Sequence, residues 1–151
     1  MDRDICIIGS GVGGGAVALT LADSGARIAI LERGERLPRE AQNTDPTAVF
    51  IDRRYRAKES WVDGTGAAFT PGQYYFVGGH TKFYGTAMFR LRERDFEATE
   101  HQDGLSPAWP LSYADLEPFY AQAEALFRVH GQAGVDPTEP PRSSEIGRAH
   151  V

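Results

Sequence analysis

The sequence is poor in the features that mark disulfide-rich, membrane-spanning or nucleic-acid-binding proteins. Its 151 residues include a single cysteine, which excludes a disulfide within the chain. No apolar run approaches the roughly 20 residues that a membrane-spanning helix needs. Acidic residues outnumber basic ones by 21 to 16, so the positive charge that binding to a phosphate backbone requires is missing. We therefore expect a soluble protein with no transmembrane segment and no nucleic-acid partner.

Metal-binding side chains are scarce as well. Cys6 lies inside the apolar run 5–8, where a small buried thiol is expected. The histidines are too scattered to form a zinc site with it: His80, His101, His130 and His150. No metal is predicted. The chain begins without the basic and apolar stretch of a signal peptide, so we expect a cytoplasmic location.

What the sequence does contain is a glycine-rich turn between a predicted strand and a predicted helix. Residues 5–8 are apolar and β-branched, which is typical of a strand buried on both faces of a parallel sheet. A helix is predicted over 14–24, ended by Gly25 in the left-handed conformation, and a second strand over 27–31. This order predicts a βαβ unit and an α/β fold with a right-handed crossover.

The first glycine turn has the spacing of a dinucleotide-binding motif. Gly9 suits a tight turn, Gly11 lets a pyrophosphate approach the backbone, and Gly14 allows the helix to pack closely on the strand. The free N–H groups at the start of the helix would hold the phosphates. The candidate cofactor residues of this turn are Gly9, Ser10, Gly11, Val12, Gly13 and Gly14.

An acidic residue stands where such motifs place their ribose ligand. Glu32 ends the second predicted strand, close to the distance of about 20 residues at which a carboxylate binds the adenosine ribose. A carboxylate there repels a 2′-phosphate, which disfavours NADP but leaves both NAD and FAD open. Glu32 and the adjacent Arg33 are therefore predicted to bind the cofactor.

A second glycine turn, "VGGHTKFYG" over 77–85, favours FAD. It offers backbone donors and hydroxyl groups that a nicotinamide does not need, but that the ring edges of a flavin do. The candidate cofactor residues of this turn are Val77, Gly78, Gly79, Thr81, Tyr84 and Gly85. His80 is interpreted as a loop residue satisfied by hydrogen bonds.

The segments around the second turn are predicted from turn residues and charge. Residues 37–58 are charged and aperiodic, which indicates a long surface connection of the kind that often forms a lid. Two hairpins are predicted over 61–77, and they would bring the second glycine turn back towards the first. The charged run 90–96 is interpreted as a solvated, salt-bridged segment.

Near the end of the chain, an apolar stripe at three- and four-residue spacing predicts a helix. Ser112 with Asp115 would cap it, Pro118 would make it restart, and Gly131 would stop it. The stripe consists of Leu116, Phe119, Tyr120, Ala123, Leu126, Phe127 and His130. The residues after Gly131 are expected to form no regular structure.

Three stretches resemble the glucose-methanol-choline (GMC) family of FAD-dependent oxidoreductases. They are 4–34, which holds the first glycine turn, 74–96, which holds the second, and 106–131. The first motif is shared by many FAD and NAD proteins, whereas the second is much more specific. The sequence "WPLSYADLEPFY" in the third stretch suggests the bacterial members. Together they look like the N-terminal part of such an enzyme.

The resemblance implies a Rossmann-like FAD-binding domain of the glutathione-reductase type, doubly wound and truncated here. Such enzymes oxidise the CH–OH group of an alcohol or sugar by hydride transfer to the flavin N5. The first turn and Glu32 would hold the adenosine diphosphate half of FAD, and the second turn would flank the flavin. The family's catalytic histidine lies near the C-terminus of relatives, so no catalytic residue is expected in this chain. The electron acceptor is left open.

Two positions bear on how the flavin and substrate would bind. Many family members have asparagine where this chain has Tyr84, which leaves the substrate class open. His80 does not align with the histidine that links FAD covalently in some relatives. The resemblance therefore implies non-covalent FAD.

We expect residues 1–142 to be an incomplete FAD-binding domain and 143–151 to be a disordered, non-native tail. The end "EIGRAHV" resembles the translation of a sequencing adapter, which suggests a native sequence ending near Ser144. Two alternatives stay open from the residues. One is a non-catalytic dinucleotide-binding module, and the other is an NAD-dependent dehydrogenase.

Overall fold

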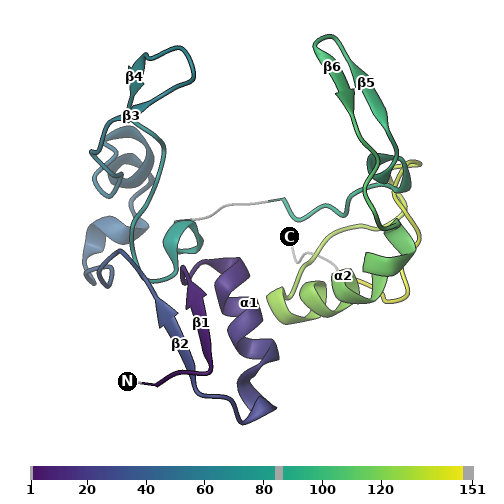
Figure 1. Cartoon of the computed structure of the whole chain (residues 1–151), viewed down its shortest axis with the longest axis horizontal. Coiled ribbons are helices and arrows are strands. Elements are labelled where there is room, and N and C mark those ends of the chain that lie inside the picture. The colour runs from purple at the N-terminus through teal and green to yellow at the C-terminus, as the bar shows by residue number, and fades with distance from the viewer. Residues whose placement is uncertain (1, 84–86, 148–151) are drawn as a thin grey trace. The chain divides into compact units, whose positions relative to one another are not determined.

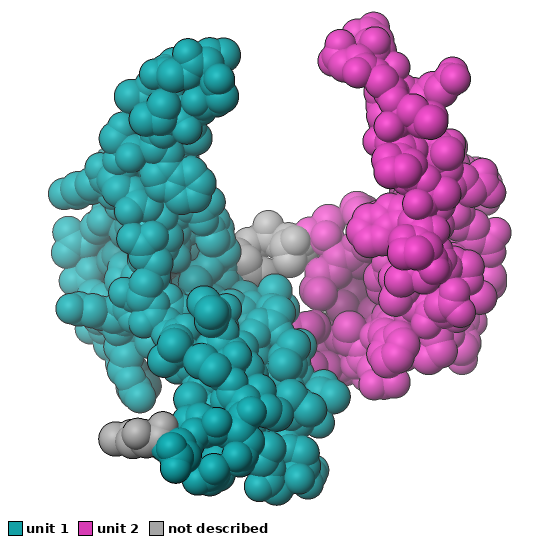
Figure 2. Space-filling view, in the orientation of Figure 1, with its two compact units in different colours: residues 1–85 teal, residues 86–151 magenta. Residues whose placement is uncertain are grey.

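The computed structural model describes residues 2–83 and 87–147, and the chain divides into two compact units. Unit 1 is Met1–Gly85 and unit 2 is Thr86–Val151, drawn in different colours in Figure 2. The three stretches that carry the family resemblance are thus shared between the units. Both glycine turns belong to unit 1.

The predicted βαβ unit is present in unit 1 (Figure 1). Strand β1, Ile5–Ile8, leads through the first glycine turn into helix α1, Val12–Thr20. A short 3₁₀ turn, Ala22–Ser24, follows, and Gly25 ends it with φ +75° before strand β2, Ile28–Leu31. Strands β1 and β2 are parallel and hydrogen-bonded along their whole length. These elements lie where the sequence predicts them, with α1 starting two residues early.

The prediction that β1 is buried on both faces is wrong. Ile7 is 9% exposed, but Ile8 is 87% exposed, and Cys6 is exposed rather than buried. Within the described residues, the parallel sheet that contains β1 has only the two strands β1 and β2. Two strands and one helix cannot cover both faces, so the doubly wound arrangement would need further strands.

The segment 37–58, predicted as a surface connection, contains much of the core of unit 1. A 3₁₀ turn, Ala41–Thr44, and a single π-helical turn, Thr47–Ile51, lie within it. The π turn buries Ala48 and Val49, and Tyr55 is also buried. The ring of Tyr55 stacks on Phe83 with centroids 4.8 Å apart. A single helical turn is too short to show a period, which is why sequence pattern misses it.

One of the two predicted hairpins forms. Strands β3, Trp61–Val62, and β4, Ala68–Phe69, pair in antiparallel fashion around a turn in which Asp63 accepts three hydrogen bonds. The second hairpin is absent from the described residues. Instead Phe76 pairs with Glu35 in a parallel bridge just beyond β2. This bridge, rather than a hairpin, brings the second glycine turn to the first.

Unit 2 consists of short elements and one long helix. A 3₁₀ turn, Glu93–Phe96, precedes the antiparallel hairpin of β5, Thr99–His101, and β6, Gly104–Ser106. Helix α2 then runs over Tyr113–Phe127. Phe96 and Tyr113 are buried, and their rings contact each other edge to face. These two side chains form the apolar centre of the unit.

Helix α2 is continuous through Pro118, so the predicted restart is wrong. The Ser112 hydroxyl and the Asp115 carboxylate form the predicted capping box, which closes the first turn. Pro118 has no N–H, and the helix loses a single hydrogen bond there. The helix ends at Arg128, which takes the left-handed conformation with φ +52°, three residues before Gly131.

The buried residues of α2 are Tyr113 and the charged Glu124, and several residues of the predicted apolar stripe are exposed. Phe119 is 62% exposed, whereas Glu124 is 7% exposed. Glu124 forms an ion pair with the buried guanidinium of Arg90, with Nη2 and Oε2 2.7 Å apart. The interpretation of 90–96 as a solvated, salt-bridged segment is therefore right about the ion pair of Arg90 but wrong about its exposure to solvent. The charged side chains of Arg90 and Glu124, which the sequence pattern predicts at the surface, are buried in unit 2.

The chain after Gly131 forms no helix or strand as far as Gly147, as expected. It still contacts α2, because the N–H of Ser143 donates to Glu117 Oε1 at 2.8 Å and Tyr113 donates to the carbonyl of Pro141 at 2.7 Å. The N–H of Gly131 donates to the carbonyl of Gly147 at 2.8 Å. The disordered, non-native character of 143–151 stays a prediction.

Candidate functional site

The first glycine turn is shaped by a close approach between its two ends. Gly9 has φ +94°, a conformation that favours glycine, and its N–H donates to the carbonyl of Leu31 at 2.7 Å. A Cβ on Gly14 would lie 2.0 Å from the carbonyl oxygen of Gly9. The start of α1 therefore packs directly on the turn after β1. The backbone conformation therefore favours glycine at Gly9, and packing requires it at Gly14.

No contact within the described protein explains why residues 11 and 13 are glycines. A Cβ on either residue would have no neighbour within 4 Å among the described residues. Gly11 caps α1 with φ −67° and ψ −171°, which any residue can adopt, and it makes no side-chain cap. The open space lies where the first N–H groups of the helix lack partners in the helix. A phosphate group suits this space in size and charge.

Glu32 follows β2 and accepts three hydrogen bonds at its carboxylate. Its Oε2 accepts from the backbone N–H and the hydroxyl of Ser10, at 3.0 and 2.6 Å, and its Oε1 accepts from the N–H of Gly34 at 2.9 Å. These bonds, the Ser10 hydroxyl first, lower the pKa of Glu32 to about 2. Glu32 is thus charged at neutral pH. A carboxylate can accept about four hydrogen bonds, so capacity remains for a ligand hydroxyl.

The second glycine turn contacts the first through one serine. The N–H of Gly78 donates to the Ser10 hydroxyl at 2.8 Å. Gly78 and Gly79 both have positive φ, +94° and +54°, and the turn continues into a 3₁₀ segment, Gly79–Lys82. Within it the Thr81 hydroxyl donates to the carbonyl of Gly78. The two glycine turns lie together, as the sequence predicts.

A glycine that sequence reasoning missed allows this arrangement. A Cβ on Gly34 would lie 2.1 Å from the carbonyl oxygen of Tyr75. Only glycine lets the segment before the second turn approach the end of β2, where the N–H of Val77 donates to the carbonyl of Glu35 at 3.0 Å. The sequence feature that could have identified Gly34 is its position two residues after Glu32, the predicted ribose ligand.

Known proteins similar to this chain are alcohol- and sugar-modifying oxidoreductases by name. No family model matches the chain. It is 35% identical to 6'''-hydroxyparomomycin C oxidase of Streptomyces lividus, over 96% of this chain and 26% of that protein. It is 32% identical to 2-methyl-1,2-propanediol dehydrogenase of Mycolicibacterium austroafricanum and to paromamine 6'-oxidase of Streptomyces fradiae, in each case over 93% of this chain and 27% of the relative. These matches support the resemblance of the chain to the glucose-methanol-choline (GMC) family.

The chain spans about a quarter of the length of these GMC relatives. Its fold also resembles the crystal structure of pyridoxine 4-oxidase from Mesorbium loti, with a TM-score of 0.53 over 78% of this chain and 24% of that one. At 22% identity this likeness concerns the fold alone. It supports a Rossmann-like domain, of which the βαβ unit is the part seen here.

Arg33, another predicted cofactor residue, is exposed and contacts two side chains of unit 1. Its guanidinium lies 3.8 Å from the ring centre of Tyr75, and its Nη2 lies 3.0 Å from Glu59 Oε2. Glu59 also accepts hydrogen bonds from Tyr75 and Trp61. The hydrogen bonds, that from Tyr75 first, lower the pKa of Glu59. Arg33 thus contacts Glu59 and Tyr75 within unit 1, and its role in cofactor binding stays a prediction.

The remaining predicted residues take varied positions. Val12 and Val77 are 51% and 40% exposed, on either side of the paired turns. The predicted cofactor residues Tyr84 and Gly85 lie outside the described residues. The interpretation of His80 agrees with its hydrogen bond to Gln73, with Nε2 and Oε1 2.8 Å apart.

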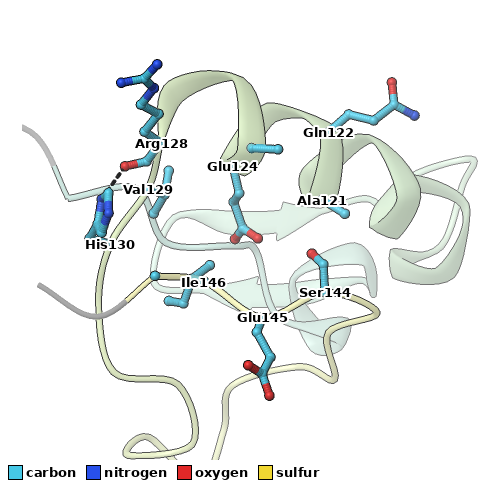
Figure 3. A pocket seen from close by; sticks show the side chains of 11 residues that line it. Ala121, Gln122, Glu124, Arg128, Val129, His130, Ser144, Glu145 and Ile146 are labelled. Carbon is cyan, nitrogen blue, oxygen red and sulfur yellow. Dashed lines mark hydrogen bonds between the residues drawn. The ribbon is translucent and has the colours of Figure 1, made fainter.

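A cavity of about 570 Å³ lies in unit 2, away in sequence from the two glycine turns. Figure 3 shows Glu124 reaching from α2 toward the segment that carries Ser144 and Ile146. None of the predicted cofactor residues lines it. One of its walls is the segment predicted to be non-native, so it is a poor candidate for a site. A smaller cavity, about 240 Å³, lies beside the second turn and is lined by Val49, Thr81 and Phe83, among others.

The described residues contain neither a metal-binding cluster nor a membrane-spanning helix. No group of three or more histidine, cysteine or acidic side chains within residues 2–83 and 87–147 could hold a metal ion. Within the same ranges, no helix combines the length and the apolar character needed to cross a membrane. The candidate site therefore consists of the two glycine turns and Glu32.

Proposed function

We propose that this chain is the cofactor-binding part of an FAD-dependent oxidoreductase that acts on CH–OH groups of an alcohol or sugar. The observation that carries the proposal is the junction of the two glycine turns at Ser10, beside a charged Glu32. One turn suits a pyrophosphate, and a second turn held against it suits a larger, flat group. The names of the relatives, oxidases and dehydrogenases of amino sugars and a diol, support the substrate class.

The site's donors and acceptors match FAD in chemistry. Glu32 offers a carboxylate acceptor to the hydroxyls of a ribose, and the start of α1 offers N–H donors to a pyrophosphate. The second turn offers the backbone of Gly78 and Gly79 and the exposed Thr81 to the flavin half. Val77, Tyr84 and Gly85 complete the proposed set. No side chain of the described site is proposed to bond FAD covalently.

A bound flavin supplies the two-electron acceptor for oxidation of an alcohol. The residues of this chain bind and orient it: Glu32 holds the ribose, and the N-terminus of α1 neutralises the phosphates. None of them is assigned the role of accepting the substrate proton. The electron acceptor that reoxidises the flavin is also left unassigned.

A titration with FAD and NAD tests the proposal. We expect the purified 151-residue chain to bind FAD with quenching of flavin fluorescence, to bind NAD at least tenfold more weakly, and to release free flavin on denaturation. Glu32→Ala should weaken FAD binding about tenfold through loss of its ribose contacts. Glu93→Ala, an exposed acidic position in unit 2, is the matched control and should bind as the parent does.

Two results would contradict the proposal. Binding of NAD with no binding of FAD would favour a nicotinamide-dependent dehydrogenase. Flavin that stays with the denatured protein would contradict the non-covalent attachment.

A further inference from the structure

Ser10 has an unusual position among the residues of the first turn, because its hydroxyl bridges two distant segments. It donates to Glu32 Oε2 at 2.6 Å and accepts from the N–H of Gly78 at 2.8 Å. The direction of both bonds is fixed, since a carboxylate can only accept and a backbone N–H can only donate. One hydroxyl therefore connects the end of β2 to the second glycine turn.

The second turn depends on this hydroxyl for its connection to the first. The N–H of Gly78 donates to the hydroxyl of Ser10. The carbonyl of Gly78 accepts hydrogen bonds from the hydroxyl and the N–H of Thr81. The carbonyl of Gly78 is therefore bonded within the second turn, whereas its N–H connects the second turn to the first. The bridge between Phe76 and Glu35 holds the preceding residues, but it does not reach Gly78 itself.

The same hydroxyl contributes to the state of Glu32. It shares Oε2 with the backbone N–H of Ser10, so loss of the hydroxyl would leave that oxygen with one donor rather than two. Gly34 would still donate to Oε1. Glu32 would thus remain in place, while Gly78 would lose the partner of its N–H.

We propose that Ser10 is a positioning residue that couples the two halves of the site, holding the second glycine turn in register with the nucleotide turn. The inference rests on the proposed binding of FAD, and it adds a role for one side chain. An adenosine diphosphate group needs only the first turn and Glu32, whereas a whole FAD needs both turns. Loss of the Ser10 hydroxyl should therefore weaken FAD binding more than ADP binding.

The experiment compares ADP and FAD binding by calorimetry in the 151-residue chain and in Ser10→Ala, Ser10→Thr and Ser24→Ala. We expect Ser10→Ala to weaken FAD binding about tenfold and ADP binding about threefold or less. Ser10→Thr, which keeps a hydroxyl, should retain most of the FAD affinity that Ser10→Ala loses. Ser24→Ala removes a serine hydrogen bond of 2.6 Å at the other end of α1, and it should leave both affinities unchanged.

Amide hydrogen exchange supplies a readout that does not depend on ligand. In the free protein, exchange at Gly78 should be about tenfold faster in Ser10→Ala than in the parent, with exchange in α1 unchanged. A variant that fails to fold would lose exchange protection throughout α1, and the Thr variant then provides the comparison.

The outcomes separate the two proposals. If the parent binds neither FAD nor ADP, the proposed function is wrong, and exchange at Gly78 still decides whether Ser10 holds the turn. If the parent binds FAD but Ser10→Ala weakens FAD and ADP equally, the coupling is wrong. Unchanged exchange at Gly78 in Ser10→Ala would overturn the inference in either case.

Discussion

The glycines of the first turn look equivalent in the sequence, but their positions call for glycine for different physical reasons. Gly14 lies where a Cβ would meet the carbonyl oxygen of Gly9 at 2.0 Å and a methyl group of Ile7 at 3.2 Å. Gly11 faces open space and has ordinary dihedral angles. Packing requires glycine at the first position, whereas no contact among the described residues requires it at the second, where we propose that a phosphate group approaches the backbone.

This difference predicts opposite phenotypes for two alanine substitutions. Gly14→Ala should lower the free energy of unfolding by about 1–3 kcal/mol, because backbone must move to admit the methyl group. Gly11→Ala should leave thermal stability within about 0.5 kcal/mol of the parent while weakening FAD binding at least about tenfold. Thermal melts and flavin titration measure both. A Gly11→Ala chain that binds FAD normally would show that no phosphate approaches this residue.

The lowered pKa of Glu32 predicts a pH dependence of stability with a definite sign. The group titrates near pH 2 in the folded chain and near 4.5 when unfolded. The unfolded state thus binds the proton more readily, so the contribution of Glu32 is fully present above about pH 5 and is lost as the pH falls towards 2. Melting temperatures of the ligand-free parent and of Glu32→Gln should differ most above pH 5 and converge near pH 2.

Comparing the two chains isolates Glu32 from the other carboxylates whose pKa values are also lowered, such as Asp4 and Asp63. A difference in melting temperature that stays constant from pH 7 to pH 2 would mean that Ser10 and Gly34 do not stabilise the Glu32 carboxylate. The prediction concerns the ligand-free chain and needs no FAD.

At the scale of elements, α2 packs through charge where its sequence pattern favours apolar contact. The side chain of Arg90 is 1% exposed and pairs with Glu117 as well as Glu124, and the hydroxyl of Tyr113 accepts from it at 2.8 Å. Arg142 also pairs with Glu124. Three segments thus meet at one hydrogen-bonded cluster: the chain at Arg90, helix α2 and the chain at Arg142.

Removing the central charge should be costly. Arg90→Ala would leave Glu117 and Glu124 without their main partner inside the unit, and we expect a loss of about 3–5 kcal/mol in the stability of unit 2. Urea unfolding followed by the fluorescence of Trp109 measures this loss. Arg94→Ala, at an exposed position a few residues away, is the control and should cost less than about 0.5 kcal/mol. Equal effects of the two substitutions would mean that the cluster contributes little.

The sequence predicts well those elements that show a clear pattern over several neighbouring residues, and it fails for elements without such a pattern. The strand, turn, helix and strand of the βαβ unit each depend on neighbours in the chain, so their order was readable. The π turn at Thr47–Ile51 and the continuity of α2 through Pro118 depend on packing and capping that outweigh the local pattern. The same reason explains the exposed Phe119 and the buried Glu124.

At the scale of the whole molecule, many large apolar side chains are exposed. Ile8 and Leu31, which lie opposite each other at the end of the β1–β2 pair, are 87% and 57% exposed. Exposed apolar surface at an open strand edge favours association between chains. We expect the 151-residue chain to bind the dye ANS and to scatter light at micromolar concentration.

Substitution of one of these residues tests the source of the association. Ile8→Thr keeps a β-branched side chain in the strand, so it should reduce ANS fluorescence and scattering without lowering the melting temperature. Ile7→Thr, at a buried position in the same strand, is the matched contrast and should destabilise unit 1. Unchanged scattering in Ile8→Thr would place the association elsewhere on the chain.

The sequence by itself determined the βαβ unit, the two glycine turns and the acidic residue after β2, together with the resemblance to the GMC family. These features depend on short-range spacing, which the chain carries whatever surrounds it. Only the tertiary structure decided that Ser10 joins Gly78, 68 residues away, that Gly34 allows that approach, and that Arg90 is buried. A hydrogen bond or a close backbone contact between distant residues exists only once folding has brought them together, and no local pattern records it.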